Sequence, residues 1–219
     1  TATLAENYGA GLRLLDFASA PEHSRQVINN WVSEQTEDKI KDLLSQDSIG
    51  PSTRLVLTNA IYFNASWKRP FPKAETRDDT FHRLDDSQVT VPMMEQTESF
   101  AYAEGEGYQA VELPYLGDEL SMIILLPEDG GFGEFADSLD AAQLASILAA
   151  LEARQVHLTM PKFTYDSGFS LKDALSDMGM AVAFSDAADF SGMTGSPGLF
   201  ISDVFHKAFV AVDEAGTEA

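Results

Sequence analysis

The residues of this chain whose types could do chemistry are its histidines, its carboxylates and a few serines. The four histidines are His23, His82, His157 and His206. No two of them have the spacing of a metal-binding pair, and the H-E-x-x-H motif of zinc peptidases does not occur. The sequence contains no cysteine, which excludes thiol catalysis, disulfide bonds and zinc–thiolate sites. We therefore expect neither a metal nor a cofactor.

Four short motifs resemble functional sites but lack the residues or the context that would define them. Residues 166–168 (Asp-Ser-Gly) lack a G-x-S-x-G elbow, and residues 130–133 lack the Gly-Lys of a phosphate loop, so both are interpreted as turns. An acidic group lacks the alternating calcium-loop pattern and is better interpreted as a solvated hairpin rim: Asp78, Asp79, Asp85 and Asp86. The glycosylation sequon at residues 64–66 matters only in a secreted eukaryotic protein. With no nucleophile–base arrangement, the chain is not expected to be an enzyme.

Composition indicates an ordinary globular protein. The chain has 219 residues, of which 44% are hydrophobic and 22% charged, enough for one large domain or two small ones. Its net charge of −21 repels phosphate backbones and anionic lipids, which excludes nucleic acid and membrane surfaces as partners. The same charge could attract a cationic partner, but a solvated acidic surface is the favoured explanation, because net charge bears on solubility more than on mechanism. No apolar run has transmembrane length, and the first residues do not form a signal peptide.

Apolar periodicity predicts four helical regions. The spacing of apolar residues predicts a helix over Pro21–Gln35, preceded by an S-x-x-E capping box at residues 19–22. A weaker helical stripe continues over residues 40–44. Further helices are expected over residues 139–154 and residues 171–178, the last closed near Gly179. Residues 184–198 are expected to form a loop.

Strand patterns are as numerous as helical ones. Residues 55–63 are almost continuously apolar, which is typical of a strand buried on both faces, and Asn59 within it would need a hydrogen-bond partner. The shorter strand candidates are residues 80–83, 89–93, 100–103, 109–113, 120–126, 155–160 and 204–212. Grouped strands and helices without βαβ alternation predict an α+β fold. Residues 213–219, which follow the last strand, contain only carboxylates, Gly, Thr and Ala, and by themselves would be interpreted as a flexible tail.

Several of these stretches together resemble the serpin family. The matches occur in family order through nearly the whole chain, which makes the resemblance specific. They are residues 28–32 with 36–40 (helix F); residues 57–63 with Trp67, Arg69, Pro70 and Phe71 (third strand of the main sheet and the following turn); residues 91–94, 113–115 and 117–127 (second sheet); residues 160–163 and 189–193 (later landmarks); and residues 206–208 and 214–219 (fifth strand and reactive-loop hinge).

The resemblance implies an α+β serpin fold with a large central sheet A, sheets B and C, and flanking helices. It identifies residues 1–219 as one partial serpin domain and residues 213–219 as the start of the reactive-loop hinge. A full serpin also has helices before the matched region, and the scissile bond and further strands after it. We therefore expect that the remaining serpin segments are needed to complete the fold and to inhibit. An extracellular or secreted location is expected on the same basis.

The implied function is inhibition of a serine protease of the trypsin, chymotrypsin or subtilisin type. Inhibitory serpins are metastable suicide substrates: the protease cleaves the loop, and the hinge side inserts into the main sheet as a new strand. The hinge residues carried over are Glu214, Ala215, Gly216, Thr217, Glu218 and Ala219. Gly216 would allow the turn that starts entry, and small residues on the buried face would avoid overpacking. The alternative is a non-inhibitory serpin that acts as a binding or carrier protein.

Three further positions receive roles from the resemblance. Asn59 and His206 lie on the two strands that must part, in the region called the shutter, where a polar bridge could act as a latch. Trp67 matches the tryptophan of the breach, near the point where the loop enters. Each could equally be a satisfied structural residue.

Overall fold

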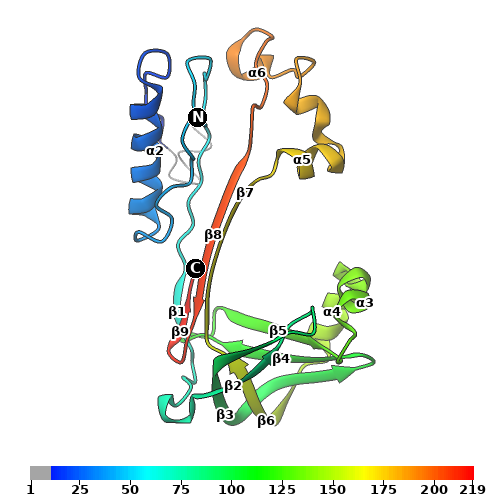
Figure 1. Ribbon diagram of the computed structural model, residues 1–219. Helices are drawn as coiled ribbons and strands as arrows, with labels where there is room; N and C mark the ends of the chain where they lie inside the picture. The colour runs from blue at the N-terminus through cyan, green and yellow to red at the C-terminus, as the bar shows by residue number, and fades with distance from the viewer. Residues whose placement is uncertain (1–10) are drawn as a thin grey trace. The chain divides into compact units, whose positions relative to one another are not determined.

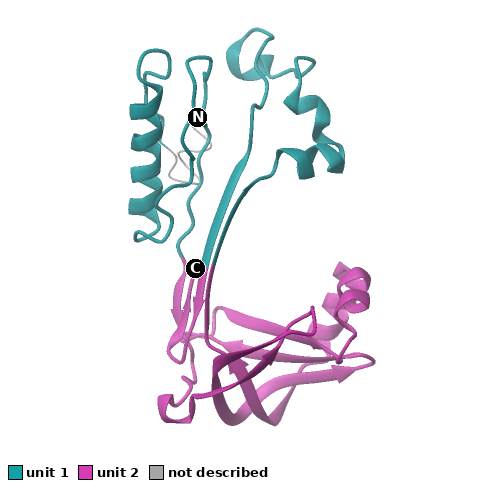
Figure 2. Cartoon of the chain, viewed as in Figure 1, with its two compact units in different colours: residues 1–62, 166–209 teal, residues 63–165, 210–219 magenta. Residues whose placement is uncertain are grey.

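The computed structural model describes residues 11–219, and the chain divides into two compact units (Figure 2). The first unit comprises Thr1–Tyr62 and Asp166–Phe209, and the second comprises Phe63–Tyr165 and Val210–Ala219. Helices and strands both contribute, which confirms the predicted α+β class. Among the residues that the structure describes, no helix is long and apolar enough to cross a bilayer.

The longest helix, α2 in the first unit, has the predicted bounds of Pro21–Gln35. Proline at the first position suits a helix start because its missing N–H would have no intrahelical acceptor there. The predicted capping box is wrong, because the N-cap is Ala20 and no side chain caps the helix. Ser19 lies outside the helix, and its hydroxyl hydrogen-bonds to the carboxylate of Asp16 at 2.8 Å. Glu22 pairs with Arg25 at 2.7 Å.

Residues 40–44 do not form the weak helix that was expected, and only turns and bends connect α2 to residue 54. The left-handed backbones of Glu37 and Asp38 interrupt helical geometry directly after α2. The buried side chain of Asn29 supplies the lost backbone partners: its Oδ1 accepts from the amide of Leu44 and its Nδ2 donates to the carbonyl of Leu44, both at 2.9 Å. Leu44 can then pack in the small core of this unit beside Ile28.

The remaining helices of the first unit are short. They are α5 (Lys172–Leu175), the π-turn η2 (Ser176–Met180), the 3₁₀ turn η3 (Ala181–Phe184) and α6 (Ser191–Thr194). The predicted helix over residues 171–178 is thus divided, and Gly179, with φ of 105°, marks the kink. The predicted loop over residues 184–198 contains α6.

The second unit is built on a five-stranded antiparallel sheet of order β2-β3-β4-β5, with β6 also paired to β3 (Figure 1). The strands are β2 (Arg77–His82), β3 (Gln88–Gly105), β4 (Tyr108–Pro114), β5 (Ser121–Pro127) and β6 (Glu152–Pro161). Two predicted strands, residues 89–93 and 100–103, are parts of the single long strand β3. The polar residues between them remain in the strand because β6 pairs with β3 from Met93 to Tyr102. One strand therefore replaces what were expected to be two.

Three short helical segments accompany this sheet: η1 (Lys73–Glu75), α3 (Phe132–Ser138) and α4 (Ala141–Ala149). The helix predicted over residues 139–154 is too long, because its last residues already belong to β6. Asp140 caps α4 by accepting from the amide of Gln143 at 2.8 Å. Ile147, almost fully buried, packs α4 against Ala103 and Ala110.

The second sheet has four strands in the order β1-β9-β8-β7 (Figure 1). They are β1 (Asn64–Ser66), β9 (Gly216–Glu218), β8 (Phe205–Val212) and β7 (Phe163–Ser170), and the last two contribute residues to both units. Residues 166–168 lie inside β7, so their interpretation as a turn is wrong. The prediction of a buried strand over residues 55–63 is also wrong. Among the described strands none pairs with residues 55–62, and Leu57 and Ile61 are about three-quarters exposed, at 75% and 74%.

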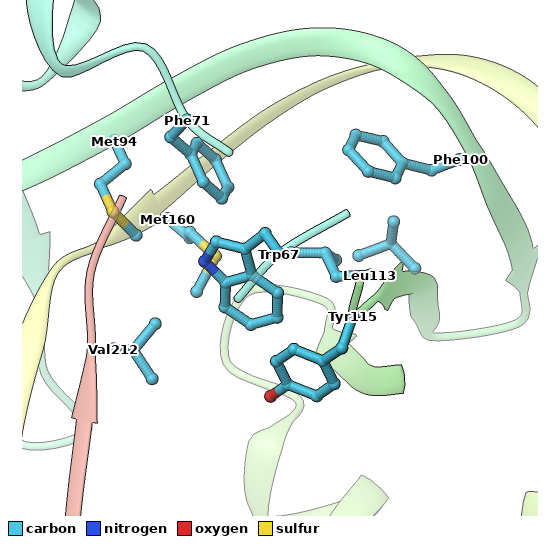
Figure 3. Packing of buried hydrophobic residues seen from close by; sticks show 9 residues of the cluster. Trp67, Phe71, Met94, Phe100, Leu113, Tyr115, Met160 and Val212 are labelled. Atoms are coloured by element: carbon cyan, nitrogen blue, oxygen red, sulfur yellow. The ribbon is translucent and has the colours of Figure 1, made fainter. Parts of the chain in front are cut away.

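A cluster of large apolar side chains forms the core of the second unit (Figure 3). It contains Trp67, Phe71, Met94, Phe100, Val111, Leu113, Tyr115, Met160 and Val212. These residues come from β3, β4, β6 and β8, from the turn after β1 and from the residue that follows β4. Burial of each such side chain stabilises the fold by roughly 1.5–3 kcal/mol before entropy is counted. The cluster lies directly against the last residues of the chain through Val212.

Candidate functional site

The candidate functional site is the hinge segment, residues 213–219, which the structure places in the four-stranded sheet. The segment begins with a tight turn after β8. The amide of Asp213 donates to the carbonyl of Gly216 at 3.0 Å, and Asp213 Oδ1 accepts from the amide of Ala215 at 2.8 Å. An aspartate that bonds its own turn in this way is a common turn initiator. The turn directs the chain back along β8.

After the turn, β9 runs antiparallel to both of its neighbours, β1 and β8. Thr217 lies opposite Ala65 on one side and Val212 on the other. The ladder continues one residue past β9, because Phe63 and Ala219 exchange backbone hydrogen bonds of 2.6 and 2.8 Å. The segment is therefore a sheet strand with backbone partners on both edges.

Gly216 is required here by a close approach of backbones. A methyl group at this position would lie 2.9 Å from Ser66 Cα and closer still to the carbonyl oxygen of Ala65. Real Cβ atoms do not approach backbone atoms so closely. We expected glycine to serve the turn, but its φ is not in the left-handed region that favours glycine.

Thr217 is buried, with 6% of its surface exposed, and its hydroxyl oxygen accepts a hydrogen bond from the Tyr115 hydroxyl at 2.9 Å. The Tyr115 ring stacks on Trp67 with a centroid distance of 4.7 Å and an interplanar angle of 10°. The edge of the Phe63 ring contacts it from another side at 5.2 Å. Burial raises the pKa of the Tyr115 phenol, so the phenol is protonated at neutral pH and can donate.

Trp67 contacts the turn of the hinge segment directly. Its indole Nε1 donates to the carbonyl of Asp213 at 2.9 Å, and its backbone amide donates to the carbonyl of Ala215 at the same distance. Only 2% of its surface is exposed, because it lies inside the aromatic cluster (Figure 3). The sequence-based expectation paired this tryptophan with loop entry, and the structure brings it against the hinge segment.

Glu214 is the buried carboxylate of the site. It is 5% exposed, and its two carboxylate oxygens bond to Lys162 Nζ and Thr76 Oγ1, each at 2.9 Å. The hydrogen bond from Lys162 is the largest cause that lowers the pKa of Glu214 to about 2, and the same bond raises the pKa of Lys162. A paired carboxylate tolerates burial that a lone one would not.

Three residues of this site were not singled out as site residues from the sequence: Thr76, Tyr115 and Lys162. Lys162 lies 52 positions from Glu214 and Tyr115 lies 102 positions from Thr217. A single sequence carries no signal for contacts at such separations. Only their place in the motif-like stretches at residues 113–115 and 160–163 could have drawn attention to two of them.

Asn59 and His206, both in the first unit, are not brought together. Both side chains are exposed, and in the described part of the chain no hydrogen bond joins them. The expected need of Asn59 for a buried partner does not arise, because the segment around it is not a buried strand. The His206 ring contacts Phe169 with a centroid distance of 5.5 Å. A latch between the two positions stays a prediction.

Metal chemistry has no support in the described residues. Within residues 11–219, no group of three or more His, Asp or Glu side chains could hold an ion. The acidic stretch at residues 78–86 is exposed along β2 and its hairpin, where Asp85 hydrogen-bonds to Ser87. The site therefore consists of a docked strand, the apolar cluster around Trp67 and one ion pair whose carboxylate is buried.

Comparison with known proteins identifies the fold. The chain is 43% identical over 214 residues to a serpin-like protein of Thermococcus kodakarensis, covering 98% of this chain and 49% of that protein. It is 41% identical to the leukocyte elastase inhibitor of Xenopus laevis, covering 99% and 60%. The chain thus spans about half the length of the curated relatives it matches.

Solved structures agree with this likeness. The emu ovalbumin structure superposes with a TM-score of 0.95 at 32% identity, covering 99% of this chain and 57% of that chain. Cleaved Serpin 42Da superposes with a TM-score of 0.93 at 36% identity, covering 99% and 59%. The family model for serpins (serine protease inhibitors) matches residues 1–219. The predicted serpin fold is therefore confirmed, and the chain belongs to the serpin family.

Proposed function

We propose that the full-length protein inhibits a serine protease as a suicide substrate, by insertion of the cleaved reactive loop into the four-stranded sheet. One observation carries the proposal: residues 216–218 are already hydrogen-bonded as β9 between β1 and β8. The relative from Xenopus laevis is named for inhibition of leukocyte elastase, and one structural neighbour is a cleaved serpin. Both likenesses support the proposal.

The contacts of the hinge segment suit this role. A strand that enters between two packed strands must bring small side chains to its buried face. Gly216 and Thr217 are small and buried, and Ala215 is exposed in the turn. The entering backbone gains hydrogen bonds on both edges, which is the source of affinity in strand addition. In the proposed mechanism the protease, still joined to the loop as an acyl-enzyme, is carried along and distorted before it can deacylate.

The roles proposed for individual residues follow from their contacts. Residues 214–219 form the hinge that enters the sheet, and Trp67 fixes the point of entry by bonding the carbonyls of the hinge turn. Asn59 and His206 are proposed to latch the sheet further along, a role for which the described residues show no direct contact. An extracellular location is proposed together with this function.

The test is a reaction of the full-length protein with trypsin, chymotrypsin and subtilisin. An inhibitor is expected to form a complex with at least one of them that survives SDS. Thermal unfolding before and after cleavage of the loop provides the second measurement, because insertion predicts a large rise in stability. A protein that is cleaved without complex formation and without any rise in stability would instead be a non-inhibitory binding or carrier serpin.

A further inference from the structure

Tyr115 and Thr217 form a buried pair of hydroxyls between a fixed part of the fold and the hinge segment. Tyr115 is 5% exposed and Thr217 6%, and the hydrogen bond between them is 2.9 Å long. A buried hydroxyl that loses its partner keeps the cost of its removal from water, so such a pair discriminates against any strand that lacks the second hydroxyl. Aromatic rings of Trp67 and Phe63 contact the Tyr115 ring on other sides.

The position of Tyr115 does not depend on the hinge segment. Its backbone amide donates to the carbonyl of Leu120 at 3.0 Å, and it forms an isolated bridge with Trp67. The next amide, of Leu116, donates to the carbonyl of Ser66 at 2.8 Å. Tyr115 is therefore tied to the end of β4 and to the turn after β1, and its hydroxyl is held where Thr217 arrives.

Gly216 restricts the register of the same strand for a different reason, namely lack of space. The backbone of Ala65 and Ser66 leaves no space for a side chain at this point. If β9 moved by one residue along β1, either Ala215 or Thr217 would occupy the glycine position and its Cβ would collide with backbone. A slip of one residue also turns each side chain to the opposite face, away from Tyr115.

We propose that Tyr115 is a positioning residue that recognises a hydroxyl at residue 217 and, together with the glycine position at residue 216, fixes the register of the inserted hinge. This inference rests on the proposed function. It adds that the sheet accepts the hinge in one register only. This register is set by the hydroxyl of Thr217 and by the absence of a side chain at Gly216. Residue 217 is selected for its hydroxyl as well as for its size.

A double-mutant cycle in the full-length protein tests the inference. Tyr115→Phe removes one hydroxyl, Thr217→Val removes the other without changing shape, and Thr217→Ser keeps it. Each single loss is expected to lower the ratio of trapped complex to cleaved inhibitor by about five-fold. This factor corresponds to the net contribution of one hydrogen bond. The double variant is expected to shift it no further than either single variant, and Thr217→Ser is expected to behave as wild type.

Tyr102→Phe is the matched control, because the Tyr102 hydroxyl bonds to Glu104 at the exposed surface of the same unit. It is expected to leave the partition unchanged. Additive effects of Tyr115→Phe and Thr217→Val, or no effect of either, in a protein that does trap a protease would overturn the inference and leave the proposed function standing.

If the wild-type protein traps no protease, the proposed function fails, and the same four variants are compared by urea denaturation after the loop is cleaved. Coupling between residues 115 and 217 in the cleaved protein would still support the register assignment. Absence of coupling would overturn it.

Discussion

At the scale of single residues, the hinge segment is held by side chains that each satisfy a different requirement. Glu214 provides a buried charge with two partners, Gly216 provides space for a neighbouring backbone, and Thr217 provides a hydroxyl. These requirements are local, so each can be removed by one substitution. The resulting predictions therefore concern the hinge segment alone.

Thr217→Arg is expected to convert the full-length protein from an inhibitor into a substrate. The site of Thr217 is almost fully buried, and an unpaired guanidinium there would cost several kcal/mol. Cleavage by the protease should continue, and the SDS-stable complex should be lost on a gel. Ala215→Arg is the control, because Ala215 is exposed in the turn, and it should retain the complex. Equal complex formation by Thr217→Arg and wild type would contradict this prediction.

Glu214 should make stability depend on pH in the acidic range. Its pKa is lowered to about 2 from the ordinary value of 4.5, so between these values the unfolded chain binds a proton that the folded chain does not. The stability that Glu214 contributes is complete above pH 4.5 and is lost as pH falls toward 2. Urea denaturation at pH 7, 5 and 3 should show a wild-type advantage over Glu214→Gln that shrinks with acidity.

Glu22 has a similarly lowered pKa of about 2, caused first by its hydrogen bond with Arg25, and it is exposed. Glu22→Gln is therefore the control that separates a pair with an exposed carboxylate from the Glu214 pair, whose carboxylate is buried. A wild-type advantage over Glu214→Gln that stayed constant from pH 7 to pH 3 would show that Glu214 titrates normally in the folded protein.

At the scale of elements, a sequence-based prediction was correct where the backbone hydrogen-bond partners of the element lie within the element itself, as they do in a helix. The helix α2 was predicted with correct bounds because its apolar spacing and Pro21 are local signals. Residues 55–63 were predicted as a strand from the same kind of local evidence and are not one, since a strand also needs a neighbour along its edge. The sequence showed β9 only as a stretch of small residues, and nothing local indicates its position between β1 and β8.

The same distinction applies within the site. The resemblance placed Trp67 and residues 214–219 together, and the structure shows them in contact. The ion pair from Glu214 to Lys162 and the hydroxyl pair from Thr217 to Tyr115 could not be predicted. They join segments that are adjacent only after the two sheets have formed.

Gly216→Ala is expected to hinder entry of the strand itself. The added methyl group would meet backbone atoms of β1, which cannot move without breaking the ladder. The rise in thermal stability after loop cleavage should become much smaller than in wild type. Ala215→Gly, a change of the neighbouring exposed residue, should preserve the rise. A full rise in Gly216→Ala would show that the sheet opens enough to accept a side chain there.

Asn29→Ala is expected to destabilise the first unit by about 1–3 kcal/mol, because the buried amide of Leu44 would lose its partner. The carbonyl of Leu44 would keep a hydrogen bond from Arg25. Urea midpoints of Asn29→Ala and of the exposed control Asn30→Ala give the comparison. Equal midpoints would mean that the connection after α2 contributes little to the stability of this unit.

At the scale of the whole molecule, the charge of −21 and the absence of cysteine limit how the fold is stabilised. No disulfide contributes, so the apolar clusters of each unit and the sheet ladders supply the stability. Among residues 11–219 the carboxylates are exposed or partly exposed, except that of Glu214, which is buried. Neutralising surface carboxylates therefore changes self-repulsion, whereas neutralising Glu214 removes a specific contact.

The turn at residues 213–216 has a consequence for timing. A two-strand turn forms in roughly 1–10 μs, and each further residue then adds to an existing ladder. Enzymes typically complete a cycle about ten times a second, so an acyl-enzyme lasts on the order of 100 ms. In the proposed mechanism, closing this turn after cleavage therefore takes a negligible part of the lifetime of the acyl-enzyme. The competition between trapping and deacylation would then be decided by how fast the bound protease is translocated, and hardly at all by how fast the strand starts.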